Sequence, residues 1–397
     1  MMISVYFDTV IIGGGPAGSS CALTLQHHGL TSCVIDRQRF PRHKLCAGLL
    51  TVKTRQLLGR LLPDISKEEF MSATDCSVAP TFKLFDKKEP VISVDIKPSI
   101  LMTERYRFDN YLLNAYKGHG GTVFEGKAVS DIDFARRIVR LEDGSEIRYN
   151  HLVAADGANS LTSRMSRKMR PGNALCAETE ISSADLRTGG VCAYFNIVPK
   201  SYAWTFKKGD HVSVGMIKLK GMNFDLKATF RKFLKFLGVN PANYPIKGAL
   251  LPMSNFKEKP TYHESVLFVG DAGGFVDPLT GEGIYFALRS GMLAAESLLQ
   301  PAPCVTYQQE LRPVIKKLKS DEKFAHLLYT PAFLRRFCKD LYKYERFVRH
   351  FYATHIDGFN ADGVVTTYMK YKWCLASKND ALQSLYEGFG VLCWFFT

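Results

Sequence analysis

The most constraining feature of the sequence is a glycine-rich segment between two apolar runs near the N-terminus. Residues 6–12 (YFDTVII) form a short apolar run that is typical of a buried parallel strand. The next residues read GGGPAG and lead into a stretch that is typical of a helix and ends at Gly29. Residues 31–36 (TSCVID) again predict a strand. This order predicts a βαβ unit, the building block of an open α/β fold.

Each glycine of this unit has its own predicted role in holding the diphosphate of a dinucleotide. Gly13 permits a tight turn, Gly15 allows a pyrophosphate to approach the backbone, and Gly18 allows the helix to pack closely on the strand. The helix N-terminus faces the phosphate charge. Asp36 ends the second strand, where an acid commonly accepts hydrogen bonds from ribose hydroxyls. The cofactor-binding residues predicted from this unit are Gly13, Gly15, Pro16, Ala17, Gly18, Asp36 and Arg37.

Composition narrows the class of protein. A chain of 397 residues that is 46% hydrophobic can fill sizeable cores, which excludes a disordered chain. We find no apolar run near the ~20 residues of a membrane-spanning helix, and the sequence predicts no secretory signal. The ten cysteines form no CxxC pair, and no histidine cluster has zinc spacing. Reduced thiols, a cytoplasmic location and the absence of a metal site are therefore expected.

The charge balance points to anionic partners. Lys and Arg (52) exceed Asp and Glu (38), which gives a formal net charge of +14. Such a surplus attracts nucleotide cofactors or anionic lipid headgroups, and peripheral contact with the inner membrane face is one expectation. No nucleic-acid motif is present, so no nucleic-acid partner is expected. After Pro301 the sequence is helical, basic and aromatic, which predicts an amphipathic helix packed on the body or, alternatively, a membrane or hydrophobic-substrate contact.

Two further motifs follow the N-terminal unit. The segment DGANS contains Asp156 and Gly157, and the segment GDAGGFVDP contains Gly270, Asp271 and Pro278. Together the three motifs resemble the FAD-dependent oxidoreductases built like the aromatic hydroxylases. The resemblance implies one noncovalently bound FAD, with the aspartate of the GD pair at the ribityl chain. In one departure, Arg164 follows Ser160 by four positions, whereas the usual spacing is three.

Three other segments resemble one branch of this superfamily, the geranylgeranyl reductase family. They are KLCAGL (44–49), the YxWxF strand (202–206) followed by VxVG (212–215), and PLTGEGI (278–284). Lys207 and Ala47 depart from the proline and glycine that the family commonly carries. Hydroxylases usually show GDAAH, whereas this chain has Gly274 at the last position, which favours the reductase branch.

The resemblance implies further site residues. A cysteine-containing loop lies near the flavin in this family, and the YxWxF strand lies beside a lipid tunnel. The candidate catalytic residues are therefore Cys46, Tyr202 and Trp204. The further cofactor-binding candidates are Lys44, Cys46, Ala47, Gly48, Arg105, Val129, Asp156, Gly157, Gly270, Asp271, Pro278, Gly281, Gly283 and Ile284. Glu282 is interpreted as a charge at a helix start, with a catalytic role as the alternative.

The expected activity is reduction of carbon–carbon double bonds in an isoprenoid or other hydrophobic substrate, by hydride transfer from reduced flavin. One alternative is a flavin-dependent monooxygenase or halogenase, although the halogenase segment WxWxIP is absent. A second alternative is a non-catalytic flavoprotein that binds a hydrophobic ligand. Because no second GxGxxG unit is present, either NAD(P)H in a transient complex or a ferredoxin is expected to donate electrons.

The expected fold is α/β, with a doubly wound, Rossmann-like FAD-binding domain, an inserted antiparallel-sheet substrate domain and a helical C-terminal region. Residues 1–75, 98–170 and 255–300 are assigned to the FAD domain. Residues 76–97 and 171–254 are assigned to the substrate domain because they alternate around aromatic residues. Residues 301–397 are assigned to the C-terminal region.

Overall fold

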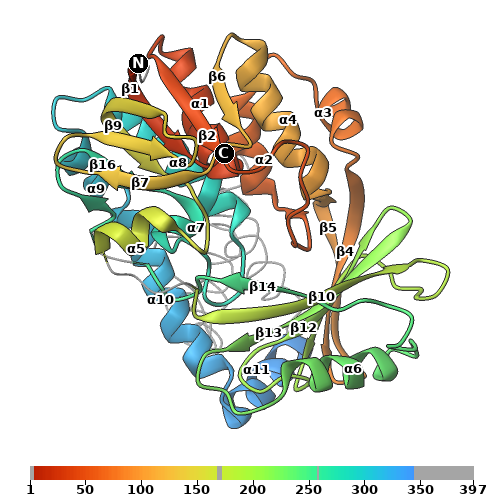
Figure 1. Ribbon diagram of the computed structural model, residues 1–397. Coiled ribbons are helices and arrows are strands. Elements are labelled where there is room, and N and C mark those ends of the chain that lie inside the picture. The colour runs from red at the N-terminus through yellow and green to blue at the C-terminus, as the bar shows by residue number, and fades with distance from the viewer. Residues whose placement is uncertain (1–3, 168–171, 257–258, 344–397) are drawn as a thin grey trace, which may run out of the picture.

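The computed structural model describes residues 4–167, 172–256 and 259–343. Two eight-stranded sheets with flanking helices make up the fold (Figure 1). The first sheet contains β1 (Ser4–Ile12), β2 (Ser32–Asp36), β6 (Thr122–Glu125), β7 (Val129–Asp133), β8 (Ile138–Leu141), β9 (Glu146–Ala154), β15 (Thr261–Tyr262) and β16 (Val266–Phe268). The second contains β3 (Leu49–Leu50), β4 (Ser77–Asp86), β5 (Glu89–Met102), β10 (Ala174–Ser182), β11 (Val191–Phe195), β12 (Ala203–Lys208), β13 (His211–Leu219) and β14 (Lys247–Leu251).

Eleven helices accompany these sheets in the described part of the chain. They are α1 (Pro16–His27), α2 (Val52–Leu61), α3 (Lys67–Ala73), α4 (Arg105–Gly118), α5 (Leu161–Arg167), α6 (Leu226–Phe236), α7 (Gly270–Gly273), α8 (Ile284–Leu298), α9 (Pro303–Glu310), α10 (Arg312–Leu328) and α11 (Pro331–Lys343). None of these helices is both long and apolar enough to cross a membrane. The mixed α/β class expected from the sequence is confirmed.

The predicted βαβ unit is present as β1, α1 and β2. Strand β1 lies between β2 and β9 and is parallel to both. Its side chains alternate, so that Ile11 packs toward the helices α1, α4 and α8, while Val10 and Ile12 pack toward the β7–β8 hairpin. Burial of both faces explains why the strand reads as a continuous apolar run.

Two glycines of this unit are required by packing within the protein itself. Gly13 has a φ of +110°, and a Cβ there would overlap the carbonyl group of Ala155. A Cβ on Gly18 would overlap the carbonyl oxygen of Gly13. The predicted tight turn and close helix–strand contact are therefore confirmed. Gly15 differs, because the nearest atom to its Cβ would be the end of the Arg42 side chain, at 3.3 Å.

The second sheet separates a packed face from a cavity face. Helix α6 covers one face through Phe230, Phe233 and Leu234, which pack on alternate residues of β10 to β13. The opposite face carries the residues of the YxWxF strand. The sheet is antiparallel as expected, except that β11 runs parallel to β4. The expected domain boundary between residues 97 and 98 falls inside β5, which continues unbroken to Met102.

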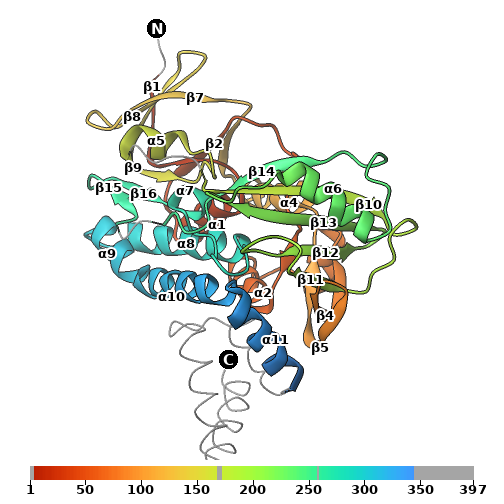
Figure 2. The ribbon, with the colours of Figure 1, turned by 90° about the horizontal axis from the view of Figure 1, so that it is seen from below.

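The helices after Pro301 connect the two sheets. Helix α9 contacts β16 of the first sheet, α10 follows it, and α11 contacts β5 of the second sheet (Figure 2). Helix α11 is amphipathic as predicted, because Leu334 and Phe337 are buried whereas Arg335 and Arg336 are exposed. Lys339 of the same helix is also exposed, whereas the basic residues Arg346 and Arg349 lie outside the described residues.

Candidate active site

A cavity of about 1230 Å³ lies between the two sheets and collects most of the predicted site residues. Its volume exceeds the several hundred Å³ of a typical small-ligand pocket, which leaves room for a dinucleotide and a second molecule. The predicted residues that line it are Gly13, Gly15, Pro16, Ala17, Asp36, Arg37, Lys44, Cys46, Ala47, Gly48, Arg105, Val129, Asp156, Gly157, Tyr202, Trp204, Asp271, Gly281, Gly283 and Ile284.

Three predicted cofactor contacts do not line this cavity: Gly18, Gly270 and Pro278. Gly18 acts in helix packing, as described above. Gly270 lies against α1, where an added Cβ would come within 2.9 Å of the Ala17 side chain. The two glycines therefore allow the elements behind the cavity wall to pack closely. Packing explains why glycine stands at these two motif positions. Arg164, whose spacing is unusual, does line the cavity.

The first functional feature is a pair of arginines beside the N-terminus of α1. Arg105 begins α4 and forms a bidentate pair with Asp109, with distances of 2.5 and 2.6 Å. Arg42 approaches the same carboxylate at 3.2 Å. Both arginines line the cavity, and Arg42 is also the nearest side chain to the Cβ position of Gly15. Two cations and a helix N-terminus at one point suit a diphosphate.

The buried carboxylate of Asp109 stabilises the protonated, positively charged form of Arg105. Burial by itself would lower the pKa of Arg105, but the Asp109 carboxylate raises it above its ordinary value. Asp109 is fully buried, so its two arginine partners hold it in place. Arg105 was predicted from the sequence, whereas Arg42 and Asp109 were not. Asp109 follows Arg105 by four positions on a helix, and this spacing was the available signal.

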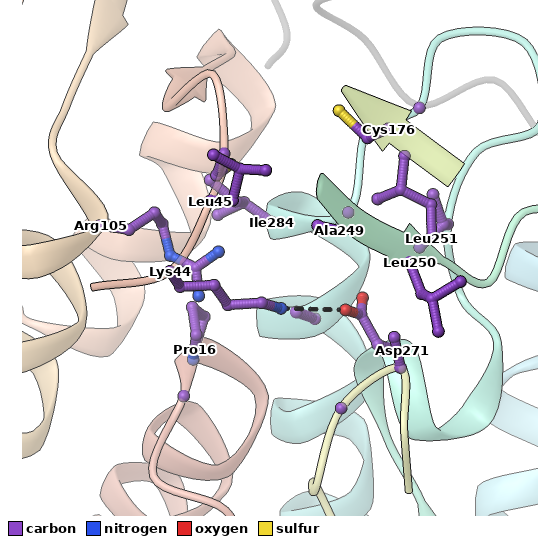
Figure 3. A pocket seen from close by; sticks show the side chains of 18 of the residues that line it. Pro16, Lys44, Leu45, Arg105, Cys176, Ala249, Leu250, Leu251, Asp271 and Ile284 are labelled. Atoms are coloured by element: carbon purple, nitrogen blue, oxygen red, sulfur yellow. Dashed lines mark hydrogen bonds and ion pairs between the residues drawn. The ribbon is translucent and has the colours of Figure 1, made fainter. Parts of the chain in front are cut away.

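A second ion pair joins two walls of the cavity. Lys44 Nζ lies 3.1 Å from Asp271 Oδ2, and Figure 3 shows the two side chains extending toward each other from opposite sides. Lys44 comes from the loop after β2, whereas Asp271 lies in α7, directly after β16. The carboxylate predicted for the ribityl chain is therefore at the cavity and is paired with a partly exposed lysine.

The other two acidic motif residues already hold backbone groups in place. Asp36 accepts hydrogen bonds from the amides of Gly14 and Gln38, both at 2.8 Å. Asp156 accepts from the Ser160 hydroxyl at 2.5 Å and from the amide and hydroxyl of Thr162. Burial raises the pKa of Asp156. Because a carboxylate offers about four acceptor positions, Asp36 can still accept from a ligand.

The YxWxF strand forms a wall of the cavity. The Tyr202 hydroxyl donates to the carbonyl of Thr280, which ties the second sheet to the 278–284 loop. Burial raises the pKa of Tyr202. Trp204 donates from Nε1 to the Ser213 hydroxyl at 3.2 Å. A Cβ on Gly215 would overlap the Trp204 ring, so the glycine of the VxVG segment makes room for this indole.

Beyond these residues the cavity wall is apolar. Strand β4 provides Phe82 and Leu84, and β11 provides Val191, Ala193 and Phe195. The far end is formed by Leu328 of α10, Phe337 of α11 and Tyr329 from the short connection between these helices. Cys46 lines the cavity half-buried, and its sulfur accepts from the Gly48 amide at 3.4 Å. A polar end and an apolar end therefore share one cavity.

A network of buried charges stands behind the 278–284 loop. Glu282 accepts from Thr51 at 2.9 Å and pairs with Lys53 at 2.7 Å. Glu282 also lines the cavity and lies two positions before the first residue of α8, so both interpretations of this charge stay open. Next to it, Lys317 of α10 pairs with Asp277 at 3.4 Å and with Asp321. This second group was not predicted: Lys317 and Asp321 are four positions apart on α10, but Asp277 precedes Lys317 by 40 positions.

Comparison with known proteins identifies the family. The family model described as FAD binding domain matches residues 6–318. An uncharacterized protein from Methanosarcina barkeri is 33% identical over 294 residues, which cover 73% of this chain and 74% of the relative. A digeranylgeranylglycerophospholipid reductase from Methanococcus vannielii is 25% identical over 342 residues, which cover 77% of this chain and 80% of the relative.

Solved structures share the fold. The crystal structure of a geranylgeranyl bacteriochlorophyll reductase-like protein from Thermoplasma acidophilum superimposes with a TM-score of 0.69 at 20% identity, covering 83% of this chain and 89% of that chain. Structures of a probable flavin-dependent monooxygenase and a halogenase also match, at 16–17% identity. These likenesses show the fold alone. With the match over residues 6–318, however, the chain belongs to the FAD-binding oxidoreductases, and it is similar, at 25–26% identity, to relatives named as digeranylgeranylglycerophospholipid reductase and geranylgeranyl diphosphate reductase.

Proposed function

We propose that the protein reduces carbon–carbon double bonds in an isoprenoid or another long apolar substrate. The observation that carries this proposal is the single cavity with a charged end beside α1 and an apolar end between β4, β11 and α11. The charged end fits the diphosphate of FAD, since Gly15 is open toward the cavity and two arginines stand beside it. The names of relatives that reduce geranylgeranyl groups support the substrate class.

When bound and reduced, FAD supplies the hydride for such a reaction. The protein's own residues bind the cofactor, orient the substrate and exclude water. Arg42 and Arg105 balance phosphate charge, and Asp271 accepts a hydroxyl hydrogen bond from the cofactor's sugar chain. The walls formed by Phe195, Trp204 and Phe337 keep water from the apolar end. Hydride transfer to a carbon–carbon double bond requires such a water-free site.

The proposed activity is tested with prereduced protein in an anaerobic cell and geranylgeranyl diphosphate as the trial substrate. Reoxidation of the flavin together with a product heavier by two hydrogens per double bond supports a reductase. A monooxygenase would instead consume oxygen and add an oxygen atom to the product. Flavin that reduces normally but is not reoxidised by the substrate would favour the non-catalytic alternative. Either NAD(P)H or a ferredoxin remains the predicted electron donor.

Replacing Asp271 by alanine should weaken FAD binding. Loss of a hydrogen bond to a charged group costs about 1.5–3 kcal/mol, which is roughly a 10- to 100-fold loss of affinity. Fluorescence titration with FAD measures the effect. The comparison variant is Asp156→Ala, because Asp156 holds the local backbone through Ser160 and Thr162 and should affect stability more than affinity. Unchanged affinity in Asp271→Ala would remove Asp271 from the binding set.

Replacing Cys46 by serine should leave FAD bound but change substrate reduction. The thiol lies on the cavity wall, and a hydroxyl is smaller, less polarizable and a far weaker acid. A proton-donating thiol predicts a large fall in single-turnover rate, whereas a packing role predicts a changed product pattern with a smaller change in rate. Product analysis by mass spectrometry separates the two. Identical rates and products in both proteins would make Cys46 an ordinary half-buried thiol.

A further inference from the structure

One buried carboxyl group of the cavity lining, that of Glu178, belongs to none of the sequence motifs. Glu178 lies on β10, is only 1% exposed to solvent and lines the cavity beside Trp204 and Cys176. Buried glutamates are rare in proteins unless a specific partner or function keeps them there. Its hydrogen-bond donor is Ser213 of the neighbouring strand, whose hydroxyl lies 2.7 Å from Oε1.

The sheet geometry places this carboxyl group on the cavity wall that carries Trp204. Glu178 lies opposite Gly215 across the β10–β13 pair, and Gly215 lies opposite Trp204 across β12–β13. Because Gly215 has no side chain, the Trp204 indole occupies that position. A chain of hydrogen bonds then runs from Trp204 Nε1 to the Ser213 hydroxyl and on to Glu178. These contacts fix the carboxyl group on the same wall as the YxWxF strand.

We propose that Glu178 is the general acid of the reaction and donates a proton to the substrate in the cavity. The proposal rests on the function proposed above. One alkene carbon accepts the hydride that reduced FAD supplies, and the other carbon accepts the carboxyl proton of Glu178. The O–H bond breaks, the electrons of the double bond form the new C–H bond, and the glutamate regains its proton from water.

The charged groups that face Glu178 decide its protonation state. Burial raises the pKa of Glu178 to about 7, and Glu180 on the same strand and Glu104 before α4 also raise it. Lys208 of β12 and the Ser213 hydroxyl act in the opposite direction. Lys208 is largely committed to the other two carboxylates, because its Nζ lies 2.7 Å from Glu104 and 3.3 Å from Glu180.

Other acidic groups on this wall are less suited to the role. The Tyr202 hydroxyl already donates to the Thr280 carbonyl, and burial raises its pKa above the ordinary value. Burial also raises the pKa of Cys176 well above that of a free thiol. A general acid works best when its pKa lies near the working pH, and Glu178 meets this condition. With Glu178 as the proton donor, Cys46→Ser should alter the product pattern more than the rate of reduction.

The test compares Glu178→Gln with Glu180→Gln. Both residues lie on β10 and point to the same face, but Glu180 is outside the cavity. Glutamine keeps the size of Glu178 and can accept from Ser213 through its carbonyl oxygen, but its amide N–H is far too weak an acid to protonate a substrate. Prereduced Glu178→Gln should reduce geranylgeranyl diphosphate about 10²- to 10⁴-fold more slowly than wild type in single turnover. At a pH well below 7, where Glu178 stays protonated in both proteins, Glu180→Gln should keep the wild-type rate, and both variants should bind FAD.

Two readouts other than the rate of the loaded enzyme test the assignment. The infrared difference between FAD-free wild type and Glu178→Gln should show a protonated carboxyl band that titrates near pH 7, and this band should persist in Glu180→Gln. The Asp321 carboxyl, whose pKa is also raised to about 7, is common to all these proteins and cancels in the difference. In Ser213→Ala the same band should titrate at higher pH, because a hydrogen bond that favours the ionised form is lost. No difference in this band between wild type and Glu178→Gln overturns the proposal.

The outcomes distinguish this proposal from the one on which it rests. If wild type reduces the substrate and Glu178→Gln does so at the same rate, Glu178 is not the acid and the reductase function stands. If wild type leaves the substrate unchanged, both proposals fall. The wild-type single-turnover rate should also decrease as the pH rises through about 7, where Glu178 loses its proton. A rate independent of pH in this range contradicts the role.

Discussion

Gly15→Val should yield a folded protein that is colourless, whereas the wild type should be yellow with one noncovalent FAD per chain. The valine side chain would extend into the cavity where the backbone must approach a diphosphate. Within the protein, the first added atom would meet only the end of the Arg42 side chain, at 3.3 Å. We expect FAD affinity to fall at least about 10- to 100-fold, as for one or two lost charged hydrogen bonds.

Two other glycines give the controls for this experiment. A side chain at Gly59 of α2 meets nothing within 4 Å, so Gly59→Val should remain yellow. A side chain at Gly18 overlaps the carbonyl oxygen of Gly13, so Gly18→Val should disrupt folding as well as FAD binding. Absorbance spectra, FAD titration and circular dichroism separate these results. A wild type that stays colourless after FAD addition would contradict the cofactor assignment, and a yellow Gly15→Val would contradict the role of Gly15.

The features that could be predicted from sequence are those encoded by local patterns. The strand at residues 6–12, the helix after it and the acid at Asp36 form one βαβ unit, and hydrophobic period and turn residues suffice to read it. The DG and GD segments were also located correctly, because they end strands β9 and β16 at the cavity. Packing glycines such as Gly270 look identical in sequence to glycines that approach a ligand.

The features that could not be predicted depend on contacts between distant segments. Arg42 and Asp109 are 67 positions apart, yet share one ion pair. Glu178 sits in an alternating strand, where its position would predict a solvent-facing side chain. Only the fold shows that the face of β10 that carries Glu178 lines a cavity and is not exposed to bulk water. Likewise, β11 pairs with β4 in parallel because of the chain topology, and the sequence of neither strand indicates this pairing.

Lys317→Met should destabilise the protein by about 3–5 kcal/mol, because it removes one member of a buried ion network. Lys317 is 1% exposed and lies between Asp277 and Asp321, which are equally buried. The methionine fits a similar volume but leaves two carboxylates without their shared cation. Urea denaturation of the wild type and the variant measures the difference. Lys323→Met on the exposed side of the same helix is the control and should change the free energy of unfolding by less than about 0.5 kcal/mol.

The pH dependence of this difference tests its cause. Burial and the neighbouring Asp277 raise the pKa of Asp321 above its unfolded value of about 4. The folded state therefore binds more protons between the two values, and the free energy of unfolding falls as the pH rises through that range. Without Lys317 the folded pKa should rise further, so the window extends to higher pH and the deficit of Lys317→Met shrinks in acid. A deficit independent of pH would mean that lost packing, and not uncompensated charge, destabilises the variant.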